Sequence, residues 1–201
     1  MLLLLALLAP TSGQGQESIV LVMGDSISAA YGMELSQGWV ALLQKRLELT
    51  HPTWKVINGS ISGETAAGGL RRLPALMTTH RPGIVLIELG GNDGLRGYPI
   101  NQLQENLKGL VRTAEAEGAQ ALLAAMEIPP NFGSRYTTLF RESFEKVAED
   151  SDAILIPFLL ANVAVNPALM QADGIHPTQQ AQSTILDNVW PYLEAALAGS
   201  Q

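Results

Sequence analysis

The chain has 201 residues, of which 47% are hydrophobic and 15% are charged, so it can bury one substantial core and is short for two domains. Its 12 basic and 19 acidic residues give a formal net charge of −7, which repels a phosphate backbone and anionic lipid headgroups. The absence of cysteine excludes thiol catalysis, thiolate metal sites and disulfides. We therefore expect a single domain over residues 17–201 and no nucleic-acid partner.

The first 16 residues are predicted to be a secretory signal peptide. Residues 2–9 are uninterruptedly apolar, but this run is far shorter than the ~20 residues that span a bilayer. Residues 11–16 then supply small side chains suited to cleavage. No lysine or arginine precedes the run, which departs from the usual signal pattern and leaves a disordered tail or a membrane anchor as alternatives. We expect a periplasmic or secreted protein without stable membrane insertion.

Five short aliphatic runs alternate with longer segments of helical periodicity. The expected strands are residues 19–23, 55–58, 84–89, 121–126 and 153–157. Successive strands lie about thirty residues apart, which is the length of a right-handed βαβ unit, and their continuous apolarity suits strands covered on both faces. The sequence therefore predicts an α/β fold, a three-layer α/β/α sandwich with a five-stranded parallel sheet.

Between the runs, apolar residues recur at spacings of three and four. These patterns predict helices around residues 39–47, 103–111, 140–147 and 185–193. The segment after Gly63 is less regular, and Pro74 is expected to begin a second short helix there. The long connection over residues 158–175 has no clear periodicity, and such connections in compact domains are more often functional than accidental.

The first strand ends in Gly24-Asp25-Ser26, which places a serine hydroxyl at the edge of the sheet. In isolation, a role as a turn or helix-cap residue also explains Ser26. A role for Ser26 as nucleophile is supported only if a base and the carboxylate that orients it occur elsewhere in the chain.

Asp173-Gly174-Ile175-His176 supplies both groups near the other end of the chain. His176 is predicted to be the base, and Asp173 is predicted to accept from its ring and fix the tautomer. The two remaining histidines, His51 and His80, are expected at helix ends that precede strands, and thus on the opposite rim of the sheet.

Loops that follow parallel strands emerge on one rim, where ligands of open α/β sheets bind. If the strand order is 2-1-3-4-5, Ser26 lies between the loop that carries Gly63 and the loop that carries Asn92. An oxyanion would then be held by the backbone N–H groups of Ser26 and Gly63 and by the Asn92 side-chain amide. Taken singly, Gly63 and Asn92 are also ordinary turn residues.

The same rim is expected to bind the substrate. Six apolar residues are candidates to line a shallow groove for an acyl chain: Leu95, Ile100, Ile128, Pro129, Pro130 and Phe132. Anchoring of these loops against the core is an equal alternative. Glu88, a charged residue in an apolar strand, is expected to be a carboxylate held by hydrogen bonds, and it is assigned no catalytic role.

Together the segments around Ser26, Gly63, Asn92 and Asp173-Gly174-Ile175-His176-Pro177 resemble the four blocks of the SGNH (GDSL) hydrolases. More closely, the chain resembles the bacterial thioesterase I / lysophospholipase L1 / arylesterase group over residues 19–197. The resemblance implies a flavodoxin-like SGNH hydrolase fold and hydrolysis of carboxylic esters and thioesters, including lysophospholipids. It implies the same roles as the residues themselves suggest for all five proposed site residues: Ser26, Gly63, Asn92, Asp173 and His176.

Other classes of protein fit less well. No phosphate-binding or dinucleotide-binding glycine pattern follows the first strand, which disfavours a nucleotide or flavin module. Ser28 stands where the nucleophile elbow of an α/β-hydrolase has glycine. No His-x-x-x-His spacing occurs, so we expect no metal and no cofactor. A noncatalytic interaction domain remains open, and the expected state is a monomer acting on a small acyl ester or thioester.

Overall fold

Five parallel strands form the centre of this computed structural model, which describes residues 17–199. The strands are β1 (Ser18–Gly24), β2 (Trp54–Asn58), β3 (Ile84–Glu88), β4 (Gln120–Ala124) and β5 (Ile154–Ile156). Their order is β2-β1-β3-β4-β5, and every neighbouring pair is parallel. The predicted strands and the 2-1-3-4-5 order are confirmed, with strand ends displaced by up to two residues.

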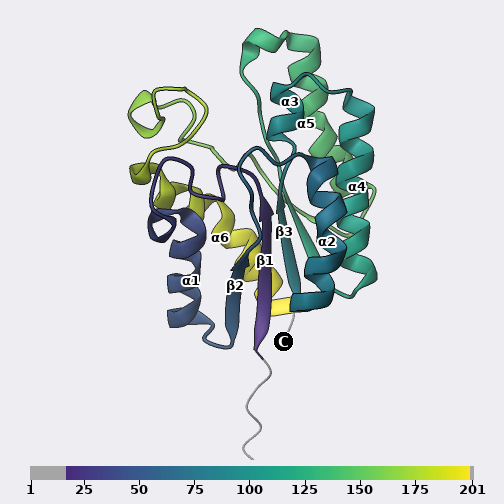
Figure 1. Cartoon of the computed structure of the whole chain (residues 1–201), viewed down its shortest axis with the longest axis vertical. Coiled ribbons are helices and arrows are strands. Elements are labelled where there is room, and N and C mark those ends of the chain that lie inside the picture. The colour runs from purple at the N-terminus through teal and green to yellow at the C-terminus, as the bar shows by residue number, and fades with distance from the viewer. Residues whose placement is uncertain (1–16, 200–201) are drawn as a thin grey trace, which may run out of the picture.

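Helices cover both faces of the sheet (Figure 1). The long helices are α1 (Trp39–Thr50), α2 (Ala66–His80), α4 (Ile100–Ala116), α5 (Ser134–Glu149) and α6 (Gln182–Gly199). Helices α1 and α6 pack together on one face, while α2, α4 and α5 pack side by side on the other. This arrangement confirms the predicted three-layer α/β/α sandwich. The predicted signal segment, residues 1–16, lies outside the described residues.

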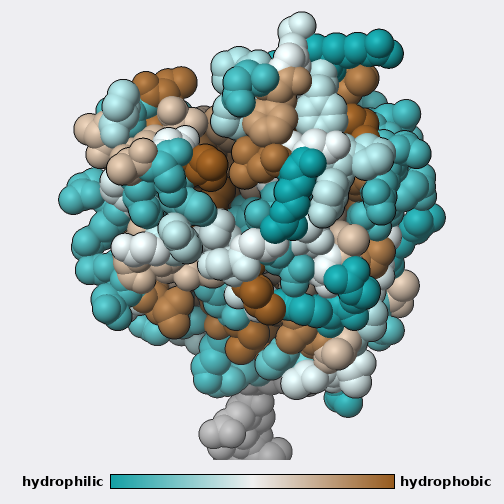
Figure 2. Space-filling model, turned by 45° about the horizontal axis from the view of Figure 1, so that its top comes forward, coloured by the Kyte–Doolittle hydropathy of each residue, from teal (hydrophilic) through white to brown (hydrophobic). Residues whose placement is uncertain are grey.

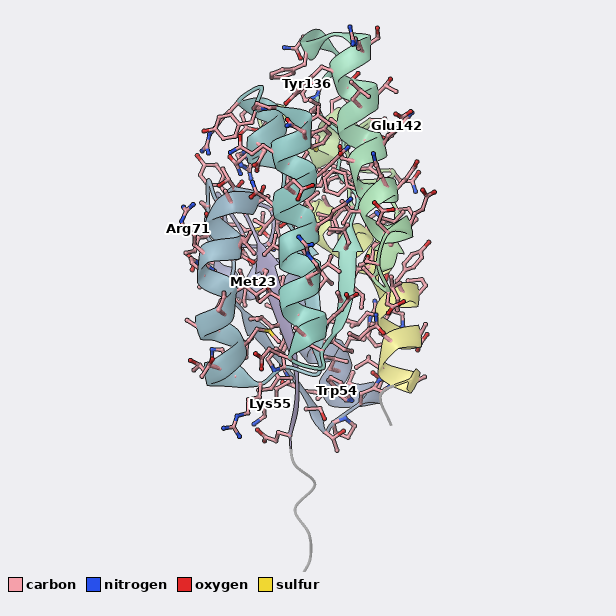
Figure 3. The ribbon with its side chains drawn as sticks, turned by 90° about the vertical axis from the view of Figure 1, so that its right-hand side faces the viewer. Met23, Trp54, Lys55, Arg71, Tyr136 and Glu142 are labelled. Carbon is pink, nitrogen blue, oxygen red and sulfur yellow. The ribbon has the colours of Figure 1, made fainter. Side chains whose placement is uncertain are left out.

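The core lies between these layers because the central strands are apolar on both faces. Residues 20–23 of β1 and 84–87 of β3 are completely buried. Figure 3 shows Met23 in the interior, whereas Lys55 and Arg71 extend from the surface. None of the helices within residues 17–199 combines the length and apolarity needed to cross a bilayer.

Helix α2 runs without interruption through Pro74, so the prediction of a second helix beginning there is wrong. Pro74 removes only one helical hydrogen bond, and the buried side chains of Leu73 and Met77 hold the segment to the core. Gly69 does not break the helix either. A Cβ at Gly69 would overlap the Leu89 side chain, so this glycine allows the helix to lie close to the sheet.

The segments that follow the strands meet at the upper rim of the sheet (Figure 1). Irregular segments join there with the short helix α3 (Gly91–Leu95) and three 3₁₀ turns, η1 (Leu35–Gln37), η2 (Pro130–Phe132) and η3 (Pro167–Leu169). The loop after β2 is tied to the end of β1, since Ile61 N–H donates to the Gly24 carbonyl at 3.1 Å. The rim is therefore a set of loops bonded to one another as well as to the sheet.

Candidate active site

Ser26, His176 and Asp173 form one chain of hydrogen bonds on this rim. His176 Nε2 lies 2.8 Å from Ser26 Oγ, and His176 Nδ1 lies 2.6 Å from Asp173 Oδ2. A carboxylate only accepts, so Nδ1 carries the ring hydrogen and Nε2 is left as an acceptor for the serine proton. The structure thus brings together three residues that are as much as 150 positions apart in the sequence.

The turn that carries Asp173 and His176 fixes their geometry. Asp173 Oδ1 accepts the backbone N–H groups of Ile175 at 2.9 Å and of His176 at 3.0 Å. The bond from the His176 backbone, then that from its ring and that from Ile175, lower the pKa of Asp173 from 3.8 to about 2. Asp173 is therefore ionised and held in place near neutral pH. Pro177 pairs with Met170 in an antiparallel bridge before η4 (Gln179–Ala181) begins.

A tyrosine packs on the histidine. The rings of Tyr31 and His176 have centroids 4.2 Å apart and are tilted by 32°. Gln171 helps to hold this segment, since its side-chain amide donates to the Tyr31 carbonyl at 2.9 Å. Tyr31 follows Ser26 closely in the sequence, yet no motif pointed to it, because ring contacts between distant segments leave no periodic signal.

Two backbone N–H groups of the rim loops have no acceptor among the described residues. Within residues 17–199, the N–H groups of Ser26 and Gly63 donate to no other protein group. Gly63 has a φ of +80°, a conformation that favours glycine, and the Arg96 guanidinium donates to its carbonyl oxygen at 3.1 Å. Gly63 sits on the exposed loop beside the site and does not line the cavity that contains Ser26. Both N–H groups are available to an anionic oxygen.

Asn92 is on helix α3, which directly follows β3. The sequence indicated only a turn at this point, whereas the structure has a short helix beginning at Gly91. Asp93 joins this helix to the first turn of α2, because its Oδ2 accepts the Ala66 N–H at 2.9 Å. Asn92 Nδ2 donates to Asp25 Oδ2 at 3.1 Å, which orients the amide towards the segment that carries Ser26.

Glu88 is held by hydrogen bonds, as expected for a charged residue in an apolar strand. Its Oε2 accepts from Ser28 Oγ at 2.6 Å and from the Asp25 N–H at 3.2 Å. Burial, and after it the negative charge of Asp25, raise the pKa of Glu88 well above its ordinary value. Burial also raises the pKa of Asp25. The sequence did not indicate that these two carboxyls meet.

A cavity of about 530 Å³ opens beside Ser26, Asn92 and His176. Among the predicted groove residues, those on its wall are Leu95, Ile128, Pro129 and Pro130. Phe132 is not on the wall, which corrects that prediction: its half-buried ring packs near Tyr136 of α5, with centroids 6.5 Å apart. Ile100 packs against the core as the first residue of α4 and is not on the wall either.

The opposite wall of the cavity comes from the long connection after β5. Its lining residues include Leu159, Leu160, Ala164, Val165 and Met170. The sequence marked this connection as functional by its length, but it did not identify these side chains because they follow no period. In Figure 2, where the rim faces forward, the hollow has apolar walls. The cavity is thus suited to an apolar ligand next to a polar reacting centre.

The two other histidines do not join the site. His51 is the C-cap of α1, and His80 is the last residue of α2, so both lie at the opposite rim as predicted. Within residues 17–199, no three histidine, aspartate or glutamate side chains are grouped as a metal ion requires. The chemistry that the described residues can supply is nucleophilic attack by a serine with proton transfer through a histidine.

Comparison with known proteins agrees with this chemistry. The GDSL-like Lipase/Acylhydrolase family matches residues 22–183. Esterase TesA of Pseudomonas aeruginosa is 52% identical over 184 residues, which cover 92% of each chain. Thioesterase 1/protease 1/lysophospholipase L1 of Escherichia coli is 43% identical over 168 residues, covering 84% of this chain and 79% of that protein.

A solved structure also matches closely. The psychrotrophic esterase EstA from Pseudoalteromonas sp., inhibited by monoethylphosphonate, has a TM-score of 0.86 and 43% identity, and the match covers 90% of this chain and 99% of that one. With the family match over most of the chain, these similarities confirm the resemblance seen in the sequence. The chain belongs to the GDSL-like lipase/acylhydrolase family and is an ester hydrolase.

Proposed function

We propose that the protein hydrolyses carboxylic esters and thioesters with Ser26 as nucleophile, His176 as general base and acid, and Asp173 as the carboxylate that orients the histidine. The observation that carries this proposal is the continuous path from Ser26 Oγ to His176 Nε2 at 2.8 Å and from His176 Nδ1 to Asp173 Oδ2 at 2.6 Å. Both pairs of atoms are at hydrogen-bond distance before substrate arrives, as proton transfer requires.

In the first half-reaction, Ser26 Oγ attacks the acyl carbonyl carbon while His176 Nε2 takes the serine proton. The carbonyl oxygen becomes an oxyanion, and the donors proposed to bind it are the N–H groups of Ser26 and Gly63 and the amide of Asn92. The imidazolium then gives its proton to the departing alcohol or thiol. The C–O or C–S bond breaks, and the acyl group remains on Ser26.

In the second half-reaction, water loses a proton to His176 and attacks the acyl-enzyme carbonyl. The same donors receive the second oxyanion. As the tetrahedral intermediate collapses, the proton on His176 returns to Ser26 Oγ and the carboxylic acid leaves. Asp173 stabilises the imidazolium in both halves through its bond to Nδ1.

The apolar cavity beside Ser26 is proposed to bind the acyl chain. Leu95, Ile128 and Pro129 form one wall, and the other wall comes from residues of the connection after β5. Single-chain acyl esters, acyl thioesters and lysophospholipids all present one acyl chain to such a cavity. The relatives are named esterase, thioesterase and lysophospholipase, which supports the same range of substrates.

The proposed active form is a monomeric single domain over residues 17–201, acting in the periplasm or outside the cell after removal of residues 1–16. A monomer would suffice for this function, because one chain supplies every proposed catalytic group. The apolar run at residues 2–9 supports export. Detection of a processed N-terminus near residues 14–17 outside the cytoplasm would test the localisation.

A fluorophosphonate probe tests the proposed nucleophile. It should label the protein once, and mass spectrometry should find the adduct on the peptide containing Ser26. Ser26→Ala should abolish labelling and turnover of p-nitrophenyl butanoate while preserving the unfolding temperature. Labelling of another residue, or turnover that survives Ser26→Ala, would contradict the proposal.

A further inference from the structure

Two buried carboxyls lie directly beneath the proposed nucleophile. Asp25 is 3% exposed and Glu88 is completely buried. The strand register pairs Gly24 of β1 with Glu88 of β3, so the glutamate carboxyl lies under the turn that begins at Asp25. A Cβ at Gly24 would lie 2.5 Å from Glu88 Oε2, so the glycine of the Gly-Asp-Ser segment makes room for this carboxyl.

One oxygen of Glu88 lacks a partner. Oε2 accepts from Ser28 and from the Asp25 backbone, whereas Oε1 has no hydrogen-bond partner among the described residues when it is treated as an acceptor. A completely buried oxygen without a partner costs free energy. A proton on Oε1 would remove this deficit, because Glu88 could then donate to the carboxylate of Asp25, whose own backbone N–H already binds Glu88 Oε2 at 3.2 Å.

Electrostatics place the proton on Glu88 and the charge on Asp25. Burial and the charge of Asp25 raise the pKa of Glu88. Burial also raises the pKa of Asp25, but the hydrogen bond that its carboxylate accepts from the Ile27 backbone, 3.0 Å long, opposes that rise. Within residues 17–199, no lysine or arginine forms an ion pair with either carboxyl. A shared proton is therefore what limits the buried charge to one.

The Asp25 carboxylate in turn selects the orientation of Asn92. Both ends of an asparagine amide have similar shape, but a carboxylate accepts and does not donate, so it binds the NH₂ end. One N–H is used in the 3.1 Å bond to Asp25 Oδ2. The second N–H is left for the cavity, whose wall includes Asn92.

We propose that Glu88 is a positioning residue: it stays protonated at neutral pH, donates to Asp25, and so holds the Asn92 amide with an N–H directed at the oxyanion. This inference rests on the proposed function, in which Asn92 is an oxyanion donor. Glu88 does not touch the substrate. Its effect on the rate passes through Asp25 and Asn92.

Substitutions at Glu88 separate this role from simple packing. Glu88→Gln replaces the O–H donor with an N–H donor of similar shape and should keep kcat within about threefold of the parent protein. Glu88→Leu removes the donor and should lower kcat by about the 10² to 10³ expected for loss of one oxyanion donor, with little change in KM. Ser28→Ala is the matched control, since it removes the other side chain bound to Glu88 and should leave kcat unchanged.

A double-mutant cycle asks whether Glu88 acts through Asn92. Glu88→Leu combined with Asn92→Ala should be no slower than Asn92→Ala alone. Additive losses in kcat would overturn the proposal. A loss in Glu88→Gln equal to that in Glu88→Leu would also overturn it, because the rescue by a neutral donor would be missing.

A spectroscopic measurement keeps the proposal testable if Glu88→Leu does not fold. The infrared spectrum at neutral pH should contain the C=O band of a protonated carboxylic acid that is lost in Glu88→Gln. A spectrum without that difference would overturn the inference even if the fluorophosphonate still labels Ser26. Failure of the proposed function is distinct, since it would appear as loss of Ser26 labelling in the parent protein.

Discussion

The apolar cavity beside Ser26 predicts a rate that depends on acyl-chain length. Burial of one methylene contributes about 0.8 kcal/mol, which is about fourfold in kcat/KM when the group is fully buried. The cavity is open at its lip, where Val165 is 86% exposed, so we expect about half of this value, or about twofold per methylene. Between butanoate and octanoate, kcat/KM should then rise about 16-fold, with about 200-fold as the limit for complete burial.

The assay is a series of p-nitrophenyl esters kept below the concentrations at which they form micelles. Ala164→Trp places a bulky ring on the lip of the cavity at an exposed position and should reduce the preference for octanoate. Ala168→Trp is the matched control, because Ala168 is exposed on the same connection but does not line the cavity. A kcat/KM that stays flat or falls with chain length, or a preference that Ala164→Trp leaves unchanged, would refute the acyl cavity.

Three further variants test the site and the core. Asn92→Ala should lower kcat for p-nitrophenyl butanoate by about 10² to 10³, because one oxyanion donor is lost; a decrease below tenfold would contradict that role. Asp173→Asn should lower kcat by about 10⁴, because His176 loses its acceptor at Nδ1. The pKa of Asp173 is lowered from 3.8 to about 2, so its contribution to stability is present above pH ~4 and lost as the pH falls towards 2. The difference in unfolding temperature between the parent and Asp173→Asn should shrink over that interval, and a constant difference would contradict it. Gly69→Ala should lower the free energy of unfolding measured in urea, because the added Cβ overpacks against Leu89. Overpacking costs about 1–3 kcal/mol, which exceeds the ~1 kcal/mol gained in helix propensity. An unchanged free energy of unfolding would show that the Leu89 side chain moves freely.

The strands and their order were predictable because the strands of a parallel sheet that is covered on both faces are apolar along their whole length. β3 is an uninterrupted buried segment from Ile84 to Glu88. Five such runs at regular spacing leave few topologies. The proposed catalytic side chains were predictable for a related reason, since Ser26 and Asn92 stand immediately after strands that must end at the same rim.

What the sequence did not show depends on packing between distant segments. Pro74 was expected to begin a helix, but contacts of the buried face of α2 outweigh the loss of one backbone bond. Phe132 was expected in the groove, but η2 directs it towards Tyr136. The link between Asp25 and Glu88 arises from strand register, which a single sequence does not reveal.

The catalytic proposal also explains why the rate should fall on acidification. Only a neutral His176 can accept the Ser26 proton, so protonation of its ring blocks attack. Asp173 remains ionised in mildly acidic solution, because its pKa is lowered to about 2. The activity at acidic pH is thus governed by the histidine and not by the carboxylate that supports it.

In the proposed active site, Ser26, His176 and the three oxyanion donors surround one reacting carbonyl. A crystal structure of this protein after reaction with a monoethylphosphonate inhibitor would reveal whether they do. We predict phosphorus bonded to Ser26 Oγ, with the phosphonyl oxygen within hydrogen-bond distance of the Ser26 and Gly63 N–H groups and of Asn92 Nδ2. Phosphorus on another residue, or a phosphonyl oxygen directed away from these donors, would contradict the account.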